Sequence, residues 1–379
     1  MSPTIALDAR WIRSGRADGV GRYTQSLIRE LLALDGPERY VLLFGGMAAR
    51  DELVLSVPSA RDVETVVLGG KLLGIQDWLG TPSELAGRGL DLLHVPSFLT
   101  SPFHRGYRTV VTVHDLIPWT STGRTPQARG AWRAFFATKL PLRAILRRAD
   151  RIIAVSRSTA EALRAHSWLR GPVDVVPNGV EVPAREGRET SPSLAGALLY
   201  VGRLDPYKNV EGWLREFAAL PAQVREQHPL VLCGNHDPRF ARPLETLARS
   251  LGIERQVRWL GTVSEQRLDE LYRGAAMLVH PSRDEGFGLT VLEAMARGTP
   301  VVGYAIPALV EVAGDAARLT STGERGGLGR AVLELLADPA TRARLGSLGR
   351  ARASQFTWRA TALGTRAVYR AALGIPAGE

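Results

Sequence analysis

Short, nearly continuous apolar runs recur along this chain with helical patterns between them, and the series restarts after a break near residue 190. The first series comprises residues 5–7, 40–44, 92–95, 109–113 and 151–155; the second comprises 198–201, 230–233, 257–260, 277–280 and 301–303. Strands that are apolar on both faces are typical of a parallel sheet covered by helices on both sides. The sequence therefore predicts an α/β protein with two Rossmann-like, doubly wound domains, whose ligands bind beyond the carboxyl ends of the strands.

The break between the two series predicts the domain boundaries. Residues 182–193 are rich in Pro, Gly, Glu and Arg and have no periodicity, as expected of a linker. We predict an N-terminal domain over residues 1–183 and a C-terminal domain over 194–355, facing each other across a cleft. The last segment, 356–379, has helical spacing and is predicted to cross back to the first domain.

Composition narrows the class of protein. The single cysteine, Cys233, lies in an apolar run and indicates a buried thiol in a reducing compartment. Asp8 and Arg10 precede any apolar segment long enough for a signal peptide, and no apolar run reaches the ~20 residues that span a bilayer. We therefore expect a cytoplasmic protein. Its net charge of +10 favours anionic partners.

Two cations follow the first strand of the second series. Arg203 comes directly after that strand, and Lys208 precedes a predicted helix near Asn209, which could cap it. A helix N-terminus beside an Arg and a Lys favours a bound anion. The pair suits the negative charge that develops on a departing diphosphate. Solvated cations on a loop are the alternative interpretation.

Two carboxylates follow a later strand. Glu285 and Glu293 frame the segment Glu-Gly-Phe-Gly-Leu-Thr-Val-Leu-Glu, in which Gly286 and Gly288 allow the backbone to approach a ligand. Residues 289–297 are predicted to be helical and to end at Gly298. A carboxylate accepts hydrogen bonds from two vicinal hydroxyls, which fits sugar rings. A solvent-facing Glu293 and a structural ion pair at Glu285 are the alternative.

The first domain carries two weaker signals. Gly19 and Gly21 lie between the first strand and a helical pattern over 23–34, so backbone N–H groups there could meet a phosphate. The stretch is neither a complete GxGxxG nor a Walker A loop. His114 and Asp115 end the strand at 109–113 and are predicted to reach the ligand crevice. A structural hydrogen bond and a tight glycine turn are equal alternatives.

Taken together, these residues resemble the retaining glycosyltransferases of family 4, which have the GT-B fold. The resemblance covers nearly the whole chain, through residues 19–23, His114 and Asp115, 176–180, the Arg203/Lys208 segment and 285–302. The Glu-x7-Glu segment is its most specific part.

The resemblance implies that the domain over residues 1–183 lies on the acceptor side, that the domain over 194–355 binds the nucleotide-sugar donor, and that each site residue has a role. Arg203 and Lys208 would bind and neutralise the donor diphosphate, and Glu293 would hold the ribose. Glu285 and the backbone amides of Phe287, Gly288 and Leu289 would hold the transferred sugar, with His114 near its reacting face. Gly19 and Gly21 would approach the phosphates. Catalytic duty would fall to Arg203, Lys208, His114 and Glu285.

The sequence departs from the family at one position and lacks one motif. Thr290 stands where many relatives carry proline, so the resemblance leaves the sugar open. Because no Asp-x-Asp occurs, we expect no metal and no other cofactor, with Arg203 and Lys208 in the role of the cation. No catalytic nucleophile is evident.

Residues 129–151 form a basic stretch with aromatic and aliphatic residues between its arginines. A basic amphipathic helix can lie on an anionic membrane surface, although Pro141 divides this one. Packing of the apolar side chains in the core is the alternative. We expect no nucleic-acid partner, because no reader motif accompanies the charge.

The sequence thus predicts a metal-independent, retaining hexosyltransferase of polysaccharide biosynthesis. Its donor would be a nucleotide sugar, with GDP-mannose as first candidate, and its acceptor a glycan or a lipid-linked glycan. Two alternatives are a GT-B-like sugar-nucleotide epimerase, which needs no acceptor, and a non-catalytic nucleotide-sugar-binding subunit.

Overall fold

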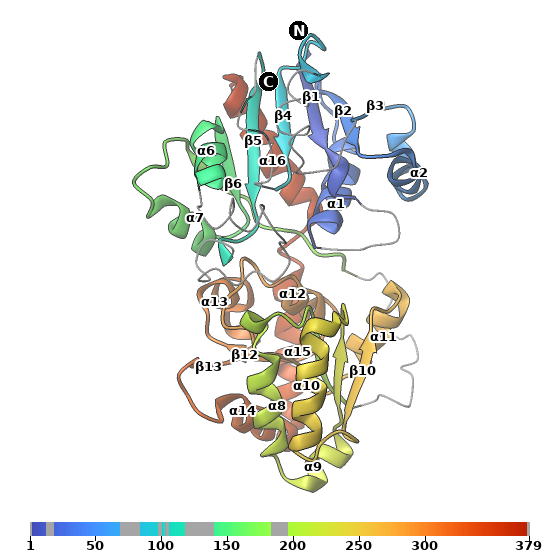
Figure 1. The fold of residues 1–379 in the computed structure, drawn as a ribbon, viewed down its shortest axis with the longest axis vertical. Helices are drawn as coiled ribbons and strands as arrows, with labels where there is room; N and C mark the ends of the chain where they lie inside the picture. The colour runs from blue at the N-terminus through green and yellow to red at the C-terminus, as the bar shows by residue number, and fades with distance from the viewer. Residues whose placement is uncertain are drawn as a thin grey trace. The chain divides into compact units, whose positions relative to one another are not determined.

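The computed structural model describes residues 2–12, 19–68, 84–97, 101, 103, 106–117, 140–182 and 196–376. The chain divides into two compact units (Figure 1). Unit 1 comprises Met1–Gly179 and Trp358–Glu379, and unit 2 comprises Val180–Thr357.

Unit 1 is built on a parallel sheet. Within the described residues the sheet has seven strands in the order β3-β2-β1-β4-β5-β6-β7. They are β1 (Thr4–Asp8), β2 (Arg39–Phe44), β3 (Glu64–Val67), β4 (Leu92–Val95), β5 (Arg108–Val113), β6 (Arg151–Ala154) and β7 (Val173–Val175). The described helices are α1 (Gly19–Leu32), α2 (Met47–Ser56), α6 (Leu140–Arg148), α7 (Arg157–Arg164) and α16 (Trp358–Leu373), with 3-10 turns η1 (Ala9–Trp11) and η2 (Pro58–Ala60).

Both faces of this sheet are buried, which explains the nearly continuous apolar strands. Alternate residues of β1 point to opposite faces: Leu7 joins the core beneath α1 and α16, whereas Ala6 joins the core on the other side. Helix α16 packs against α1, β5 and β6 (Figure 1). Its Val368 and Tyr369 are buried beside Tyr23 of α1. The last helix of the chain therefore completes the core of unit 1.

Unit 2 repeats the same architecture. Its described sheet has six parallel strands in the order β10-β9-β8-β11-β12-β13. They are β8 (Leu198–Val201), β9 (Leu230–Cys233), β10 (Val257–Gly261), β11 (Met277–His280), β12 (Val301–Tyr304) and β13 (Arg318–Thr320). The helices are α8 (Val210–Ala218), α9 (Ala222–Gln227), α10 (Pro238–Ser250), α11 (Glu265–Gly274), α12 (Leu289–Ala296), α13 (Pro307–Ala313), α14 (Gly327–Ala337) and α15 (Pro339–Ala353), with 3-10 turns η4 (Pro206–Lys208) and η5 (Gly314–Ala316).

The strand order reverses once in each sheet. In unit 1 the chain moves outward from β1 to β3 and then resumes on the other side of β1 with β4. In unit 2 it moves outward from β8 to β10 and resumes beside β8 with β11. Loops on the two sides of such a reversal diverge at the carboxyl ends of the strands and leave a crevice. In unit 2 the loops at this reversal are those that follow β8 and β11.

The expected α/β class is confirmed, and all ten predicted strands are present. The structure adds β3, β7 and β13, which the sequence reading missed. All three are edge strands with a neighbour on one side only. Because an edge strand meets solvent, its residues are mixed, as in Val173-Asp174-Val175, and lack the apolar run that marks a buried strand.

Two local predictions were wrong. Helix α1 begins at Gly19, four residues before the expected start at Tyr23, so Gly19 and Gly21 lie in its first turn. The side chain of Asn209 does not cap α8. Its φ of 54° lies in the left-handed region, which asparagine tolerates better than most residues, and it links η4 directly to α8. Among the described helices, none combines the length and the apolar character that a bilayer crossing needs.

Candidate functional site

The loops after β8 and β11 carry the predicted cations and the first predicted carboxylate. Arg203 lies two residues beyond β8, and Lys208 ends η4 just before α8. Glu285 lies five residues beyond the end of β11. The Nζ atom of Lys208 is 2.5 Å from Oε1 of Glu285. This ion pair joins the two loops across the strand-order reversal of unit 2.

A second donor reaches the same carboxylate oxygen. The Nε2 atom of His280, the last residue of β11, lies 2.8 Å from Oε1 of Glu285. The side chains of Lys208 and Glu285 are only 15% and 10% exposed, and that of His280 is buried. Among the described residues, no hydrogen bond reaches the other oxygen, Oε2. Two donors thus fix one of the two carboxylate oxygens of Glu285.

The pair is ionised at neutral pH. Burial alone would lower the pKa of the Lys208 ammonium, but the charge of Glu285, the nearby Tyr207 and the hydrogen bond to Glu285 together outweigh burial and raise that pKa. Burial alone would raise the pKa of the Glu285 carboxyl, but Lys208 and the hydrogen bond from His280 lower it well below its usual range. Because a buried ion pair gains little net stability after desolvation, its presence in a crevice favours a functional role.

Arg203 is more exposed than Lys208. Its side chain is 49% accessible, and its Nε atom lies 3.3 Å from Oδ2 of Asp205. Its Nη2 group donates a 2.7 Å hydrogen bond to the hydroxyl of Tyr207. The Tyr207 ring also faces Lys208, whose Nζ lies 5.2 Å from the ring centroid. Tyr207 thus lies next to both cations and orients the exposed one.

The second predicted carboxylate lies on helix α12. Oε2 of Glu293 accepts a 2.8 Å hydrogen bond from the hydroxyl of Tyr272 in α11. The helix begins at Leu289, directly after Gly288, whose φ of 96° favours glycine. Phe287 is buried and packs edge-on against Phe356. In the first turn the amide of Val291 donates to the carbonyl oxygen of Gly288 at 3.0 Å, whereas the amides of Leu289 and Thr290 precede the first intrahelical hydrogen bond.

The remaining predicted residues belong to unit 1. His114 follows β5, and its Nε2 donates to the carbonyl oxygen of Pro96 at 2.9 Å. A carbonyl oxygen can only accept, so Nε2 carries a proton. Asp115 accepts from the amide of Ile117 at 3.0 Å and holds the turn after the strand. Gly19 begins α1, and nothing lies within 4 Å of the place where its Cβ would stand.

Comparison with known sequences decides the family. Residues 17–182 match the profile described as Glycosyltransferase Family 4, and residues 189–352 match the profile described as Glycosyl transferases group 1. O-antigen chain mannosyltransferase B of Escherichia coli is 30% identical over 280 residues, which cover 70% of this chain and 71% of the relative. The chain belongs to glycosyltransferase family 4.

Other similar proteins share its family or its fold. A D-inositol 3-phosphate glycosyltransferase of Kineococcus radiotolerans is 35% identical over 62% of this chain and 60% of the relative. The serotype-specific mannosyltransferase WbdA of E. coli is 26% identical over 94% of this chain, which spans about half (47%) of that protein.

Two solved structures have the same GT-B fold of two Rossmann-like domains. Sucrose-phosphate synthase of Thermosynechococcus elongatus matches with a TM-score of 0.73 and 24% identity over 98% of this chain and 99% of that chain. Anabaena HepE, solved with UDP-glucose, matches with a TM-score of 0.73 and 19% identity over 97% and 99%.

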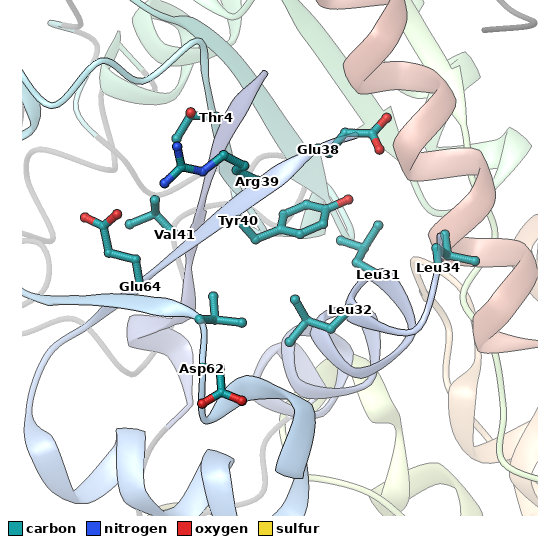
Figure 2. Close-up of a pocket in the computed structure, with 11 residues that line it drawn as sticks. Thr4, Leu31, Leu32, Leu34, Glu38, Arg39, Tyr40, Val41, Asp62 and Glu64 are labelled. Carbon is teal, nitrogen blue, oxygen red and sulfur yellow. The ribbon is translucent and has the colours of Figure 1, made fainter. Parts of the chain in front are cut away.

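A cavity of about 370 Å³ in this glycosyltransferase lies away from these residues. It is found at the amino ends of β1, β2 and β3, with Tyr40 and the leucines of α1 on its wall (Figure 2). Ligands of doubly wound sheets bind at the opposite, carboxyl ends. None of the predicted site residues lines it. In the described part of the chain, no group of three or more His, Cys, Asp or Glu side chains could hold a metal ion.

Only part of the basic stretch 129–151 can be assessed, because residues 129–139 lie outside the described ranges. In α6, Leu142, Ile145 and Leu146 pack in a core of unit 1. The arginines at 143, 147 and 148 are exposed. For this half of the stretch, the apolar side chains occupy the core.

Sequence reasoning missed three contributors to the site. His280 ends a predicted strand, and a polar residue at the carboxyl end of a buried strand was an available signal. Tyr207 lies between the two predicted cations, where its aromatic ring was a second signal. Tyr272 lies on α11, far from Glu293 in sequence, and no local pattern connects the two.

Proposed function

We propose that this family 4 protein transfers a hexose from a nucleoside diphosphate donor to a glycan or lipid-linked acceptor, with retention of anomeric configuration. The ion pair of Lys208 with Glu285 across the strand-order reversal of unit 2 is the observation that carries the proposal. In this proposal Lys208 meets the diphosphate and Glu285 meets the sugar hydroxyls, and both lie at the carboxyl ends of the strands, where doubly wound sheets bind ligands.

Each donor group has an assigned partner. Lys208 and Arg203 bind the diphosphate oxygens; the half-exposed Arg203 can move from Tyr207 to a phosphate. Oε2 of Glu285 accepts from sugar hydroxyls while Oε1 is held by Lys208 and His280. Glu293 accepts from the ribose diol, with Tyr272 holding its other side. The first-turn amides of α12 and those of α1 at Gly19 and Gly21 add dipoles for negative charge.

The reaction exchanges one bond at the anomeric carbon for another. The acceptor oxygen attacks on the face that the diphosphate leaves, the bond to the diphosphate oxygen breaks, and the acceptor proton passes to that departing oxygen. Lys208 and Arg203 stabilise the charge that grows on the diphosphate, which is the role a metal has in other glycosyltransferases. By the family resemblance, His114 contacts the transferred sugar.

The donor candidates follow from the relatives. GDP-mannose comes first, because the relatives include mannosyltransferases of E. coli, and UDP-glucose comes second, because HepE binds it. The same relatives suggest a role in polysaccharide biosynthesis.

A donor screen tests the proposal. Unfolding midpoints are measured with each nucleotide sugar, since a ligand of the folded state raises the midpoint. The donor that raises it most is then incubated with candidate acceptors, and the product's anomeric configuration is read by NMR. We expect an α-linked product from an α-linked donor. An inverted product, or no rise with any nucleotide sugar, contradicts the proposal.

The same assay distinguishes the alternatives. An epimerase would convert the donor with no acceptor present, and a non-catalytic subunit would bind the donor without consuming it. The cations on the leaving-group side favour transfer, because simple binding has less need to stabilise a departing diphosphate.

Peripheral membrane association is a second, separable proposal. The exposed arginines 143, 147 and 148 of α6 form a cationic face beside the exposed Leu140 and Phe103. Such a face favours the inner, anionic leaflet of a cytoplasmic membrane. Sedimentation with anionic vesicles at low salt should retain the wild-type chain and lose a variant with all three arginines changed to Ser. Equal sedimentation of the wild-type chain and the variant would show that these arginines do not bind the membrane.

A further inference from the structure

A line of buried polar side chains runs through unit 1 from α16 to α1. The hydroxyl of Tyr369 lies 2.6 Å from Nδ1 of His94, and Nε2 of His94 lies 2.8 Å from Oγ1 of Thr112. Oγ1 of Thr112 lies 3.3 Å from the hydroxyl of Tyr23. All four side chains are fully buried. They come from α16, β4, β5 and α1, so the chain of hydrogen bonds joins four separate elements.

The ring of Tyr23 ends this line against His114. The two rings meet edge-to-face, with centroids 4.7 Å apart and an interplanar angle of 84°. On another side, Trp358 packs against Tyr23 at 5.9 Å and 65°. Trp358 is the first residue of unit 1 after the chain leaves unit 2. The Tyr23 ring is therefore fixed by its hydroxyl, by Trp358 and by His114 itself.

The hydrogen bonds of this line all run from donor to acceptor in the same direction. Burial and the nearby His114 lower the pKa of His94 to about 3, so its ring is neutral at physiological pH. A neutral imidazole has one N–H donor and one acceptor nitrogen. One of Tyr369 and Thr112 therefore donates a hydrogen bond to the ring, and the other accepts one from it. Because the Thr112 hydroxyl has a single proton, the same direction continues in its hydrogen bond with Tyr23. Removing one hydroxyl leaves a buried partner unsatisfied and frees the rest to reorient.

We propose that Tyr23 is a positioning residue for His114, held in place by Thr112, His94 and Tyr369. This inference rests on the proposed function, because the orientation of His114 affects catalysis only if His114 contacts the transferred sugar. Two of the contacts of that imidazole then have separate effects: the Pro96 carbonyl fixes the proton on Nε2, and the perpendicular contact with the Tyr23 ring restrains the plane of the His114 ring.

Hydroxyl deletions separate this role from simple core packing. Tyr23→Phe keeps the ring contacts with His114 and Trp358 and removes the hydrogen bond to Thr112. Tyr369→Phe cuts the line at its far end, without touching His114. Tyr107→Phe is the matched control, because it deletes the hydroxyl of a buried tyrosine in the same unit, in the core on the other face of the sheet.

Two readouts are measured on the full chain. The first is the ring C–H signal of His114 in histidine-labelled protein, assigned with His114→Asn. The second is steady-state transfer with the donor chosen by the screen. We expect Tyr23→Phe and Tyr369→Phe each to shift the His114 signal and to lower kcat roughly 10- to 100-fold, since small misplacements of a reacting group have effects of this size. Donor KM should stay within about twofold, and Tyr107→Phe should change neither readout.

The double variant tests whether the two hydroxyls act through one line. Tyr23→Phe with Tyr369→Phe should lower kcat no further than the worse single variant, because coupled residues are not additive. An unmoved His114 signal in Tyr23→Phe overturns the proposal, and so does a shifted signal with unchanged kcat. If the wild-type chain transfers no sugar, the proposed function fails, and the His114 signal alone upholds or overturns the positioning by Tyr23.

Discussion

Lys208 and His280 both lie within hydrogen-bond distance of Oε1 of Glu285. This shared acceptor determines the effect expected when either residue is replaced. His280 and Glu285 are only five residues apart, but Lys208 comes from the loop after β8, so its contact with Glu285 does not follow from local sequence. The sequence identified Lys208 and Glu285 because cations and carboxylates after buried strands have a chemical meaning at any distance. It could not predict their direct pairing, because that contact depends on β8 and β11 being neighbours in the sheet.

Replacing Lys208 by Ala should remove the cation that stabilises the departing diphosphate. We expect kcat to fall ~10²- to 10³-fold, as for loss of one preorganised transition-state contact. Steady-state transfer measures this. Arg215→Ala, which deletes an exposed cation of α8 paired with Glu211, is the matched control and should keep full activity. Full activity in Lys208→Ala would refute the leaving-group role.

His280→Leu should weaken donor binding, because Oε1 of Glu285 loses one of its two donors and Oε2 is no longer oriented. Donor affinity, measured by calorimetry, should fall by about tenfold, consistent with the ~1.5 kcal/mol of a hydrogen bond to a charged group. His280→Gln retains an N–H donor and should recover part of the affinity. Equal affinity in the Leu variant and the wild type would rule out this positioning.

The lowered pKa of Glu285 predicts acid sensitivity. A carboxyl whose folded-state pKa lies below its ordinary value of 4.5 stabilises the fold fully above that value and loses this contribution as pH falls through the folded-state pKa. Glu285→Gln lacks this contribution at every pH. The difference in unfolding midpoint between wild type and variant should therefore be largest near neutral pH and shrink toward about pH 2. A difference independent of pH would show that Glu285 is not ionised in the fold.

At the level of elements, continuous apolar runs predicted every interior strand and missed three at the edges. The pattern works where both faces are buried and fails where solvent allows polar residues, as at Glu64 and Asp174. Helix α1 starts earlier than expected, because two glycines close together suggested a turn, whereas both lie within the first turn of the helix.

Helix α16 offers a direct test of its place in the core. Val368 is buried beside α1, whereas Leu363 on the same helix is 42% exposed. Val368→Ala should lower the free energy of unfolding by about 2 kcal/mol, from two lost methyl groups and the cavity they leave. Leu363→Ala should change it by less than ~0.5 kcal/mol. Denaturant titration of both variants measures this, and similar losses in the two would place α16 outside the core.

At the level of the whole molecule, both units use one architecture, and the sequence showed this because the same series of strands appears twice. The positions of Arg203, Lys208 and Glu285 at the carboxyl ends of strands also followed from that topology. The hydrogen bonds of Glu293 with Tyr272 and of His94 with Tyr369 did not, because they join residues distant in sequence through side-chain packing.

Transfer should proceed without a divalent metal, since Arg203 and Lys208 supply the positive charge. Activity in excess chelator should equal activity in buffer alone, measured with the donor from the screen. Loss of turnover in chelator that is restored by Mg²⁺ or Mn²⁺ would overturn this expectation.

The division of the chain also bears on how the protein is made. Unit 2 is one uninterrupted stretch, whereas unit 1 needs Tyr369 and Val368 from beyond it. During translation the strands of unit 1 therefore leave the ribosome first. Its core stays incomplete, with part of the apolar surface uncovered, until α16 has been synthesised. Unit 2 can fold during that interval, so the segment synthesised second is expected to reach its native state first.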